Sequence, residues 1–357
     1  MERTRLVVLF GGRSAEHEVS CTSAMHVLGA IDRARYDVVP IGITRDGRWL
    51  PAADIAALPA GSRSLPSPDE TGGDEVDPLP AVTASGGPPT VVFPILHGPM
   101  GEDGTVQGML ELAGVPYVGS GVLGGAACMD KGVAKDVLAA HGVPQVRWRT
   151  LRDVEVLRPG ALDAAAADLG YPVVVKPANL GSSVGITKAS TLDELETAVT
   201  GALRYDEYVV IEEAVAHPRE IELAVLGNAE PRVSVPGEVV PSHDFYDFDD
   251  KYVDGAADLR IPADLSTDQV HEAQELALVA YRALRVDGLA RVDLFLVDGR
   301  RFLVNELNTM PGFTEISMYP KLWQASGLGY SALIDELVRL AVERHARRSK
   351  FGTDRLG

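Results

Sequence analysis

One segment, LARVDLFLVDGRRFLVNELN at residues 289–308, constrains the fold more than any other part of the chain. Two β-rich runs flank Asp298-Gly299, a dipeptide that favours the positive φ angles of a two-residue hairpin turn. With these two residues as the loop, residue 297 faces residue 300. The same register pairs Arg291 with Glu306 and Asp293 with Val304.

Period-two alternation along this hairpin separates a polar face from an apolar face. Two diagonal carboxylates repel each other unless a cation lies between them, and hard oxygen ligands favour magnesium or manganese beside substrate phosphates. The alternative is a solvated face on which Arg291 pairs with Glu306. The polar face holds Arg291, Asp293, Glu306 and Asn308, and the buried face holds Val292, Leu294, Leu296 and Leu303.

Length and composition indicate a globular protein. The 357 residues suffice for two or three domains, and 46% hydrophobic with 24% charged residues argues against disorder. A formal net charge of -18 disfavours nucleic acid and anionic membranes as partners. Cys21 and Cys128 fit neither a disulfide framework nor a metal-ligand spacing, which indicates a reducing compartment. Without a recognisable signal peptide or an apolar stretch of about 18 residues, we expect a soluble cytoplasmic protein.

The first part of the chain has the pattern of a small doubly wound α/β domain. A strand-length apolar run ends at Gly11-Gly12 and is followed by helical spacing, which is the opening of a βαβ unit. Residues 58–89 are rich in proline, glycine, serine and acid, so we expect a surface excursion there. The strands and the later helix expected here span 5–10, 36–44, 90–96 and 104–113.

From residue 129 the pattern changes to α+β. Thr191 and Glu194 form a plausible capping box at the start of one helix. The residues after the last helix look frayed. Helices are expected at 130–142, 191–203, 268–286 and 331–346, and strands at 171–177, 184–189, 208–215 and 220–227.

A glycine- and serine-rich loop at 181–185 could hold a polyphosphate through backbone N–H groups and the hydroxyls of Ser182 and Ser183. It matches neither a Walker A loop nor a GxGxxG fingerprint, and most such loops are plain turns. Lys176, just before the loop, is well placed for an α or β phosphate. Lys131 lies at a helix start, where the dipole disfavours a cation unless an anion is beside it. The alternative for both lysines is a solvated surface charge.

Glu212 and Glu213 close the hydrophobic run YVVIEE, and Glu220 follows shortly after. These carboxylates could receive ribose hydroxyls or face water.

Eight motifs then follow one another along the chain. Together they closely resemble the D-alanine:D-alanine ligases of the ATP-grasp superfamily, from about residue 5 to 347. The resemblance implies an ATP-grasp fold with three domains, at 1–125, 126–222 and 223–347, and a tail at 348–357. The motifs are GGRSAEHEVS, HGPMGEDGTVQGMLE, MDKGVAK, VVKPANLGSSVG, VIEEAV, FYDFDDKY, GLARVDLF and VNELNTMPGFTEIS.

The resemblance also implies a reaction for peptidoglycan precursor synthesis. The carboxylate of a first D-alanine attacks the γ-phosphate of ATP, and the amine of a second displaces phosphate from the acylphosphate. The resemblance implies ATP, two Mg²⁺ or Mn²⁺ ions and a homodimer. The implied catalytic residues are Glu16, Ser182, Tyr252, Arg291 and Gly312; the substrate ligands His97, Lys251, Ser317 and Met318; the nucleotide ligands Lys131, Lys176, Ser183, Glu212, Glu213, Glu220 and Lys251; and the metal ligands Asp293, Glu306 and Asn308.

By the same resemblance, Glu16 would meet the ammonium group of the first D-alanine and would form a hydrogen-bonded group with Ser182 and Tyr252. The helix dipole is a second reason for a carboxylate at Glu16. A buried neutral histidine bonded to backbone is the alternative for His97. Glu213 departs from relatives, which often have a lysine beside adenine.

The segment at 242–255 has no regular period, and we expect a lid that keeps water from the acylphosphate. Within it, Tyr252 is expected to favour an amine over a hydroxy-acid nucleophile. A ligase joining D-alanine to D-lactate or D-serine is the nearest alternative function. A nucleotide-binding regulatory protein should have lost the polar hairpin residues, and none is lost. A dinucleotide-dependent oxidoreductase is disfavoured because GGRSAE lacks the third glycine of the fingerprint.

Overall fold

The computed structural model describes most of the chain. Three residues to which the family resemblance gives a role, Ser183, Lys251 and Tyr252, lie outside the described residues, as does the expected lid at 242–255. A search of the described part finds no helix with the length and apolar character needed to span a bilayer. The described residues are 3–53, 55, 58, 62–83, 89–182, 184–240, 258–314 and 316–351.

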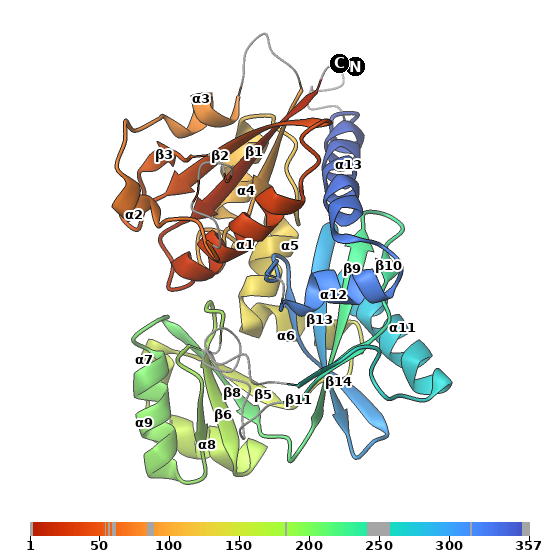
Figure 1. Ribbon diagram of the computed structural model, residues 1–357. Helices are drawn as coiled ribbons and strands as arrows, with labels where there is room; N and C mark the ends of the chain where they lie inside the picture. Colours follow the sequence, from red (N-terminus) through yellow and green to blue (C-terminus); the bar gives the residue numbers. More distant parts are fainter. Residues whose placement is uncertain are drawn as a thin grey trace, which may run out of the picture.

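The N-terminal part is built on a four-stranded sheet in the order β3-β2-β1-β4 (Figure 1). β1 pairs in parallel with β2 and β4, as a doubly wound domain requires, and β3 pairs antiparallel with β2. The three strands expected from apolar runs are confirmed, whereas β3 is too short to show a period. The elements are β1 Thr4–Gly11, α1 His17–Ala30, β2 Tyr36–Ile43, β3 Trp49–Pro51, α2 Pro68–Thr71, α3 Pro78–Val82, β4 Thr90–Pro94, α4 Thr105–Leu112 and α5 Val122–Met129.

Residues 62–83, part of the expected surface excursion, are mostly exposed or half-buried but are not without regular structure. This stretch contains α2 and α3, each of which begins with a proline at the first helical position. Leu65 and Val82 are buried. A few isolated apolar residues are enough to anchor such a segment, but they give no periodic signal in the sequence.

The central part is a four-stranded antiparallel sheet in the order β5-β8-β6-β7. The Thr191 side chain caps α9 by accepting the N–H of Glu194, while the Glu194 carboxylate accepts the N–H of Ser190 at 2.7 Å. Gly142, expected as a helix stop, follows α6 with a φ of +70°. The elements are α6 Lys131–Ala140, β5 Trp148–Arg152, α7 Asp153–Val156, α8 Ala161–Leu169, β6 Val173–Pro177, β7 Thr187–Ala189, α9 Leu192–Ala202 and β8 Tyr208–Glu213.

The C-terminal part has a six-stranded sheet in the order β12-β11-β9-β13-β14, with β10 beside β9. Long helices accompany it, and α13 runs alongside the N-terminal part in Figure 1. The final helix extends two residues beyond the expected end, into the stretch that looked frayed. The elements are β9 Arg219–Gly227, β10 Arg232–Val233, β11 Gly237–Val240, β12 Asp258–Arg260, α11 Thr267–Ala283, β13 Gly288–Val297, β14 Arg301–Asn308, α12 Met318–Ala325 and α13 Tyr330–Arg348.

The β13–β14 hairpin does not have the expected register. Asp298 and Gly299 have the anticipated positive φ angles, +52° and +63°, but Arg300 joins the loop, and its N–H bonds the Val297 carbonyl at 3.0 Å. The pairing then shifts again between Asp293 and Leu294, where β14 carries one extra residue. The pairs expected for Arg291 and Asp293 are therefore wrong.

In the structure Arg291 faces Asn308 and Asp293 faces Glu306. A three-residue loop alone would turn Glu306 toward the apolar core, because a one-residue slip exchanges the two faces of a strand. The bulge at Asn305 returns Glu306 to the face of Asp293. On the apolar face, Phe302 and Val304 pack with Val292, Leu294 and Leu296, in place of the expected Leu303.

One hydrophobic core joins the N-terminal and C-terminal parts. Phe313 packs edge-on against Phe93 of the N-terminal sheet, with ring centroids 5.8 Å apart, and lies 5.7 Å from the Tyr319 ring. Buried residues of β1 and of α13 belong to the same cluster. In the central part, α8, α9 and the sheet form a separate cluster, whereas α6 packs with the C-terminal sheet. The N- and C-terminal parts are thus held together by packing that the central part does not share.

We expect Phe313→Ala to lower the free energy of unfolding by about 3–5 kcal/mol, because it empties a fully buried site between two parts of the molecule. Urea unfolding followed by amide hydrogen exchange measures the loss, which should reach both β1 and α13. Leu112→Ala is the control; that side chain is 93% exposed, and its loss should change stability by less than about 0.5 kcal/mol. Loss of protection in α13 alone would contradict a shared core.

Candidate functional site

One polar cavity brings together residues from all three parts of the chain. Its wall includes the start of α1, the segment around residue 97, the loop at 180–182 and the turn after β14. Most of the site residues implied by the family resemblance line it, although they are widely spaced in the sequence. They are Glu16, His97, Lys131, Ser182, Arg291, Glu306, Asn308, Gly312, Ser317 and Met318.

Glu16 is buried at this cavity with one oxygen engaged and one unpaired. Its Oε1 accepts a hydrogen bond from the Ser182 hydroxyl, while Oε2 has no hydrogen-bond partner among the described residues. A Cβ at Gly98 or Gly181 would lie 2.5 or 2.7 Å from Oε2, so glycine at both positions lets backbone close around the carboxylate. Leaving such a group unsatisfied costs about 1–3 kcal/mol, more for a charge. A ligand donor, such as an ammonium group, would remove that cost.

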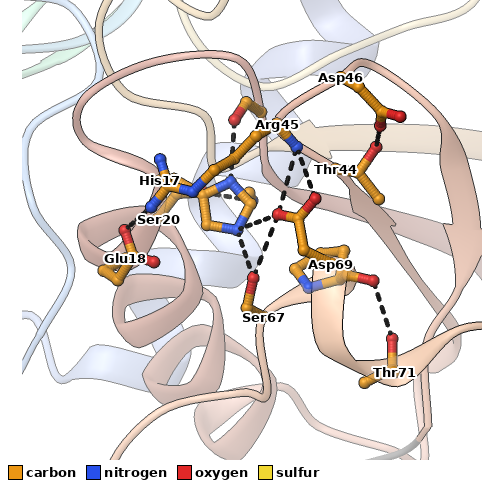
Figure 2. A network of polar contacts seen from close by, with 12 residues as sticks. His17, Glu18, Ser20, Thr44, Arg45, Asp46, Ser67, Asp69 and Thr71 are labelled. Carbon is orange, nitrogen blue, oxygen red and sulfur yellow. Dashed lines mark hydrogen bonds and ion pairs between the residues drawn. The ribbon is translucent and has the colours of Figure 1, made fainter.

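The start of α1, which carries Glu16, is fixed by the 62–83 segment (Figure 2). His17 is fully buried; its Nδ1 lies 2.8 Å from the Gly12 carbonyl and its Nε2 lies 3.0 Å from Ser67 Oγ. The Asp69 carboxylate accepts the backbone N–H of Arg45 at 3.2 Å. This network connects the variable excursion to the backbone next to the cavity.

His97 adopts the alternative considered for it. Its Nδ1 lies 2.9 Å from the Met310 carbonyl and its Nε2 lies 3.1 Å from Ser23 Oγ, and burial lowers its pKa. Since the carbonyl can only accept, Nδ1 carries the proton and the Ser23 hydroxyl donates to Nε2. His97 is therefore a buried neutral histidine bonded to backbone, and it also lines the cavity.

Glu102 is a residue of this site that sequence reasoning missed. Its Oε1 accepts the Gly98 N–H at 2.8 Å and its Oε2 accepts the Met310 N–H at 3.1 Å. Together with His97 it holds both polar groups of the Met310 backbone, two residues before Gly312. Burial, and then the nearby Glu16 carboxylate, raise the pKa of Glu102 to about 8. Its position in HGPMGEDG gave no signal for this role, because Met310 lies 208 residues away in the sequence.

The polar face of the β13–β14 hairpin is mostly buried, so the alternative of a solvated face is wrong. Arg291 Nε and Nη2 each donate to the Asp293 carboxylate at 2.7 Å, and Asn308 Nδ2 donates to it at 3.0 Å. The side chains of Arg291 and Asp293 are 18% and 13% exposed. Arg291 Nε also lies 3.1 Å from Oε2 of Glu222, on the neighbouring strand β9, which the sequence did not single out.

The donor chemistry of this face suits a hard divalent cation. Asp293 and Glu306 supply carboxylates from facing positions, and Asn308 supplies a carboxamide. Within the described ranges no group of three or more His, Cys, Asp or Glu side chains is gathered as a metal site. Because Arg291 engages both oxygens of Asp293, a cation binding there competes with that contact.

The buried residues Lys135, Lys176 and Glu212, with the half-buried Lys131, form a charge cluster at the cavity. Glu212 lies between Lys176 and Lys135, with N–O distances of 2.8 and 3.1 Å. Burial alone would raise the pKa of Glu212, but the two lysines outweigh it and hold the pKa at about 2. Burial lowers the pKa of Lys131, which donates to the Leu180 carbonyl. Lys135 was missed, although it lies one helical turn after Lys131, a spacing that puts both on one face of α6.

The remaining expected ligands lie around this cluster and the final turn. Glu213 pairs with Arg147 at 2.9 Å and is 42% exposed. Glu220 lies on β9 opposite Phe295 of β13. Ser317 precedes α12, and its Oγ accepts the Thr314 N–H at 3.0 Å. Met318 is the first residue of α12, at the helix end whose first N–H groups have no partner within the helix and can receive an anion.

The C-terminal sheet carries carboxylates, and the small antiparallel central part carries lysines. Together these two parts define the ATP-grasp class of enzyme. The model for the D-ala D-ala ligase N-terminus matches residues 5–120, and the model for the D-ala D-ala ligase C-terminus matches residues 137–339. The chain belongs to the D-alanine–D-alanine ligase family. The resemblance recognised from the eight motifs is therefore confirmed.

Curated relatives and solved structures agree with this family. A D-alanine–D-alanine ligase of Deinococcus radiodurans is 50% identical over 96% of this chain and 99% of its own length, and one of Geobacillus thermodenitrificans is 44% identical over 97% of each. The D-alanine–D-alanine ligase structure from Coxiella burnetii superposes with a TM-score of 0.80 at 34% identity, covering 98% of this chain and 97% of that one. The VanG D-Ala:D-Ser ligase from Enterococcus faecalis gives 0.79 at 34% identity, covering 95% and 100%.

The raised pKa of Glu102 predicts a pH dependence of stability. Between pH 4.5 and about 8 the folded protein keeps a proton that the unfolded chain releases, so this residue's contribution to the free energy of unfolding falls as pH rises through that window. The slope approaches about 1.4 kcal/mol per pH unit. Urea titrations at several pH values should show a shallower slope in Glu102→Gln. Glu230→Gln, at an exposed position, should keep the wild-type slope. Equal slopes for wild type and Glu102→Gln would contradict a buried, protonated Glu102.

Proposed function

We propose that this chain joins two D-alanine molecules into D-alanyl-D-alanine for peptidoglycan synthesis, at the expense of ATP. The observation that carries the proposal is the buried Glu16 carboxylate, which lines the same cavity as Arg291 and whose Oε2 has no hydrogen-bond partner among the described residues. One amino acid can place its ammonium on Glu16 while its carboxylate points toward the phosphate-binding side. The full-length relatives named D-alanine–D-alanine ligase support this substrate.

The first D-alanine would be held where α1 and the loop at 181–182 meet. Glu16 would bind its ammonium group, and Ser182 would keep Glu16 in place. The carboxylate of this D-alanine then attacks the γ-phosphate of ATP, which gives an acylphosphate and ADP. Ser182 has a φ of +50°, an uncommon conformation for a residue with a side chain, and such strain is frequent at ligand clamps.

ATP would lie against the buried charge cluster. Lys131, Lys176 and Ser183 would contact its phosphates. Glu212, Glu213 and Glu220 would receive the adenosine portion, with Glu213 acting through its backbone because its side chain pairs with Arg147. Asp293, Glu306 and Asn308 would hold two Mg²⁺ or Mn²⁺ ions, which neutralise charge on the phosphates when bound.

The second D-alanine would lie at the turn before α12. Ser317 and the Met318 N–H would receive its carboxylate, and Lys251 would reach both this substrate and the γ-phosphate. Its amine attacks the acylphosphate carbonyl, and phosphate leaves from the tetrahedral intermediate. Arg291 and the Gly312 N–H would stabilise the oxyanion, with His97 and Glu102 holding the backbone that presents Gly312. Tyr252 would complete the group around Glu16 and Ser182.

Ligation of D-alanine to D-serine is the second candidate. The VanG D-Ala:D-Ser ligase superposes as well as the Coxiella burnetii enzyme does, at the same identity. The backbone fold therefore does not distinguish the two functions, and side chains must select the second substrate.

The organisation expected from the sequence forms part of the proposal. It consists of domains at 1–125, 126–222 and 223–347 with a tail at 348–357, assembled as a cytoplasmic homodimer. The net charge of -18 supports a protein without nucleic-acid or membrane partners.

Phosphate release from ATP tests the function directly. D-alanine, L-alanine, D-lactate and D-serine are supplied separately and in pairs with D-alanine, and mass spectrometry identifies the product. We expect release that requires D-alanine and is abolished in Glu306→Gln. Equal release with L-alanine would refute the proposal, and a mixed dipeptide formed in preference to D-alanyl-D-alanine would favour the second candidate.

Glu16→Gln should raise the KM for the first D-alanine by about 10- to 100-fold, because it replaces a charge-assisted hydrogen bond worth about 1.5–3 kcal/mol. Initial rates at varied D-alanine, with saturating ATP, measure the change. Glu18→Gln is the matched control: it lies on the same helix with its side chain 67% exposed, and its KM should stay at the wild-type value. An equal effect of both substitutions would argue against an ammonium site at Glu16.

A further inference from the structure

Three carboxylates lie in one row across three adjacent strands. Glu222 of β9 faces Asp293 of β13, and Asp293 faces Glu306 of β14. Two of the three were already assigned to metal binding on the basis of sequence. Glu222, in contrast, has no role in the function described so far, although it lines the same cavity.

Arg291 is bound by two members of this row. Its guanidinium donates to both oxygens of Asp293 at 2.7 Å, and its Nε lies 3.1 Å from Glu222 Oε2. The side chains of Arg291 and Glu222 are 18% and 7% exposed, so water screens this attraction little. In the structure, Arg291 is therefore shared between the carboxylates of Asp293 and Glu222.

The metal role of Asp293 conflicts with its role as the partner of Arg291. A divalent cation bound to Asp293 shares the oxygens that now accept the guanidinium, and it repels the arginine. Without a further anchor, Arg291 would either keep Asp293 from the cation or turn away from the reacting carbon. Glu222 lies on the side of Asp293 away from Glu306, because β9 and β14 flank β13 on opposite sides. It can therefore retain Arg291 when Asp293 serves the cation.

We propose that Glu222 is a positioning residue that holds Arg291 ready for the oxyanion and leaves Asp293 available to the metal. The proposal rests on the function proposed above. It assigns Glu222 no contact with substrate; the carboxylate acts only through Arg291. Substitution of Glu222 should therefore change ligand binding only in a protein that still has Arg291.

The holding contact is tested without turnover by NMR exchange of the Arg291 Nε–H, with and without Mg²⁺ and ADP. We expect this proton to stay protected in the wild type when Mg²⁺ and ADP are added. In Glu222→Leu, Mg²⁺ with ADP should accelerate its exchange at least about tenfold, because its partner Asp293 then also binds the cation. Equal protection in wild type and Glu222→Leu would overturn the proposal, whatever the protein's substrate.

A double-mutant cycle tests the consequence for the oxyanion. The readout is the affinity, by calorimetry with Mg²⁺ and ADP, for a D-alanyl-D-alanine analogue in which a tetrahedral phosphinate replaces the amide carbon. Glu222→Leu should weaken binding about tenfold in the wild type and leave it unchanged in Arg291→Met, because interacting residues are non-additive. Glu222→Gln keeps an accepting oxygen and should restore most of the affinity. The same loss in both backgrounds would show that Glu222 acts independently of Arg291.

Glu238→Leu is the matched control. It removes a carboxylate from another arginine pair of the same sheet, with Arg219 Nε 2.7 Å from Glu238 Oε1, and should change neither readout. If Glu222→Leu does not fold, Glu222→Ala carries the same measurements. If phosphate release does not require D-alanine, the proposed function is refuted. If release is normal but the effects of substituting Glu222 and Arg291 are additive, only the role of Glu222 is refuted.

Discussion

The packing of Phe313 against Phe93 is the contact on which the cavity depends. It lies where the turn after β14 meets the N-terminal sheet, and it joins two parts of the chain into one core. Near it, His97 and Glu102 hold the Met310 backbone from the N-terminal side. The backbone that presents the Gly312 N–H is therefore fixed relative to Glu16 by buried apolar surface and by hydrogen bonds within the protein, neither of which depends on a bound ligand.

Charge is arranged differently in the two halves of the site. Glu212 and Asp293 are compensated by lysines or by Arg291, so these clusters are stable without ligand. Among the described residues, Glu16 Oε2 has no hydrogen-bond partner, and Glu102 beside it has a raised pKa. In the proposed function, an ammonium group would meet the Glu16 carboxylate on one side of the cavity, and phosphate would meet lysines on the other. This separation would orient an amino acid with its carboxylate toward ATP.

The β13–β14 hairpin shows which structural features a short segment of sequence can predict. Alternation and the Asp298-Gly299 turn placed Arg291, Asp293, Glu306 and Asn308 on one face, and they are on one face. The predicted residue pairs were wrong because the loop has a third residue and β14 has a bulge. The longer loop would turn Glu306 to the apolar face, and the bulge returns it to the polar face. Neither shift has a local signature, since each depends on how β13 packs between β9 and β14. The family motifs carried most of the remaining site, but Glu102, Lys135 and Glu222 belong to it only through partners distant in the sequence.

The sequence by itself determined the family, the strands and helices with clear periodicity, and the residue types that the chemistry needs. These features depend on spacing within short segments, where backbone geometry alone decides which side chains share a face. The tertiary structure decided which charges are paired, which carboxylate is protonated, and that Glu222 and Asp293 share Arg291. Burial and the approach of distant strands set those properties, because the energy of a charge depends on its surroundings in space.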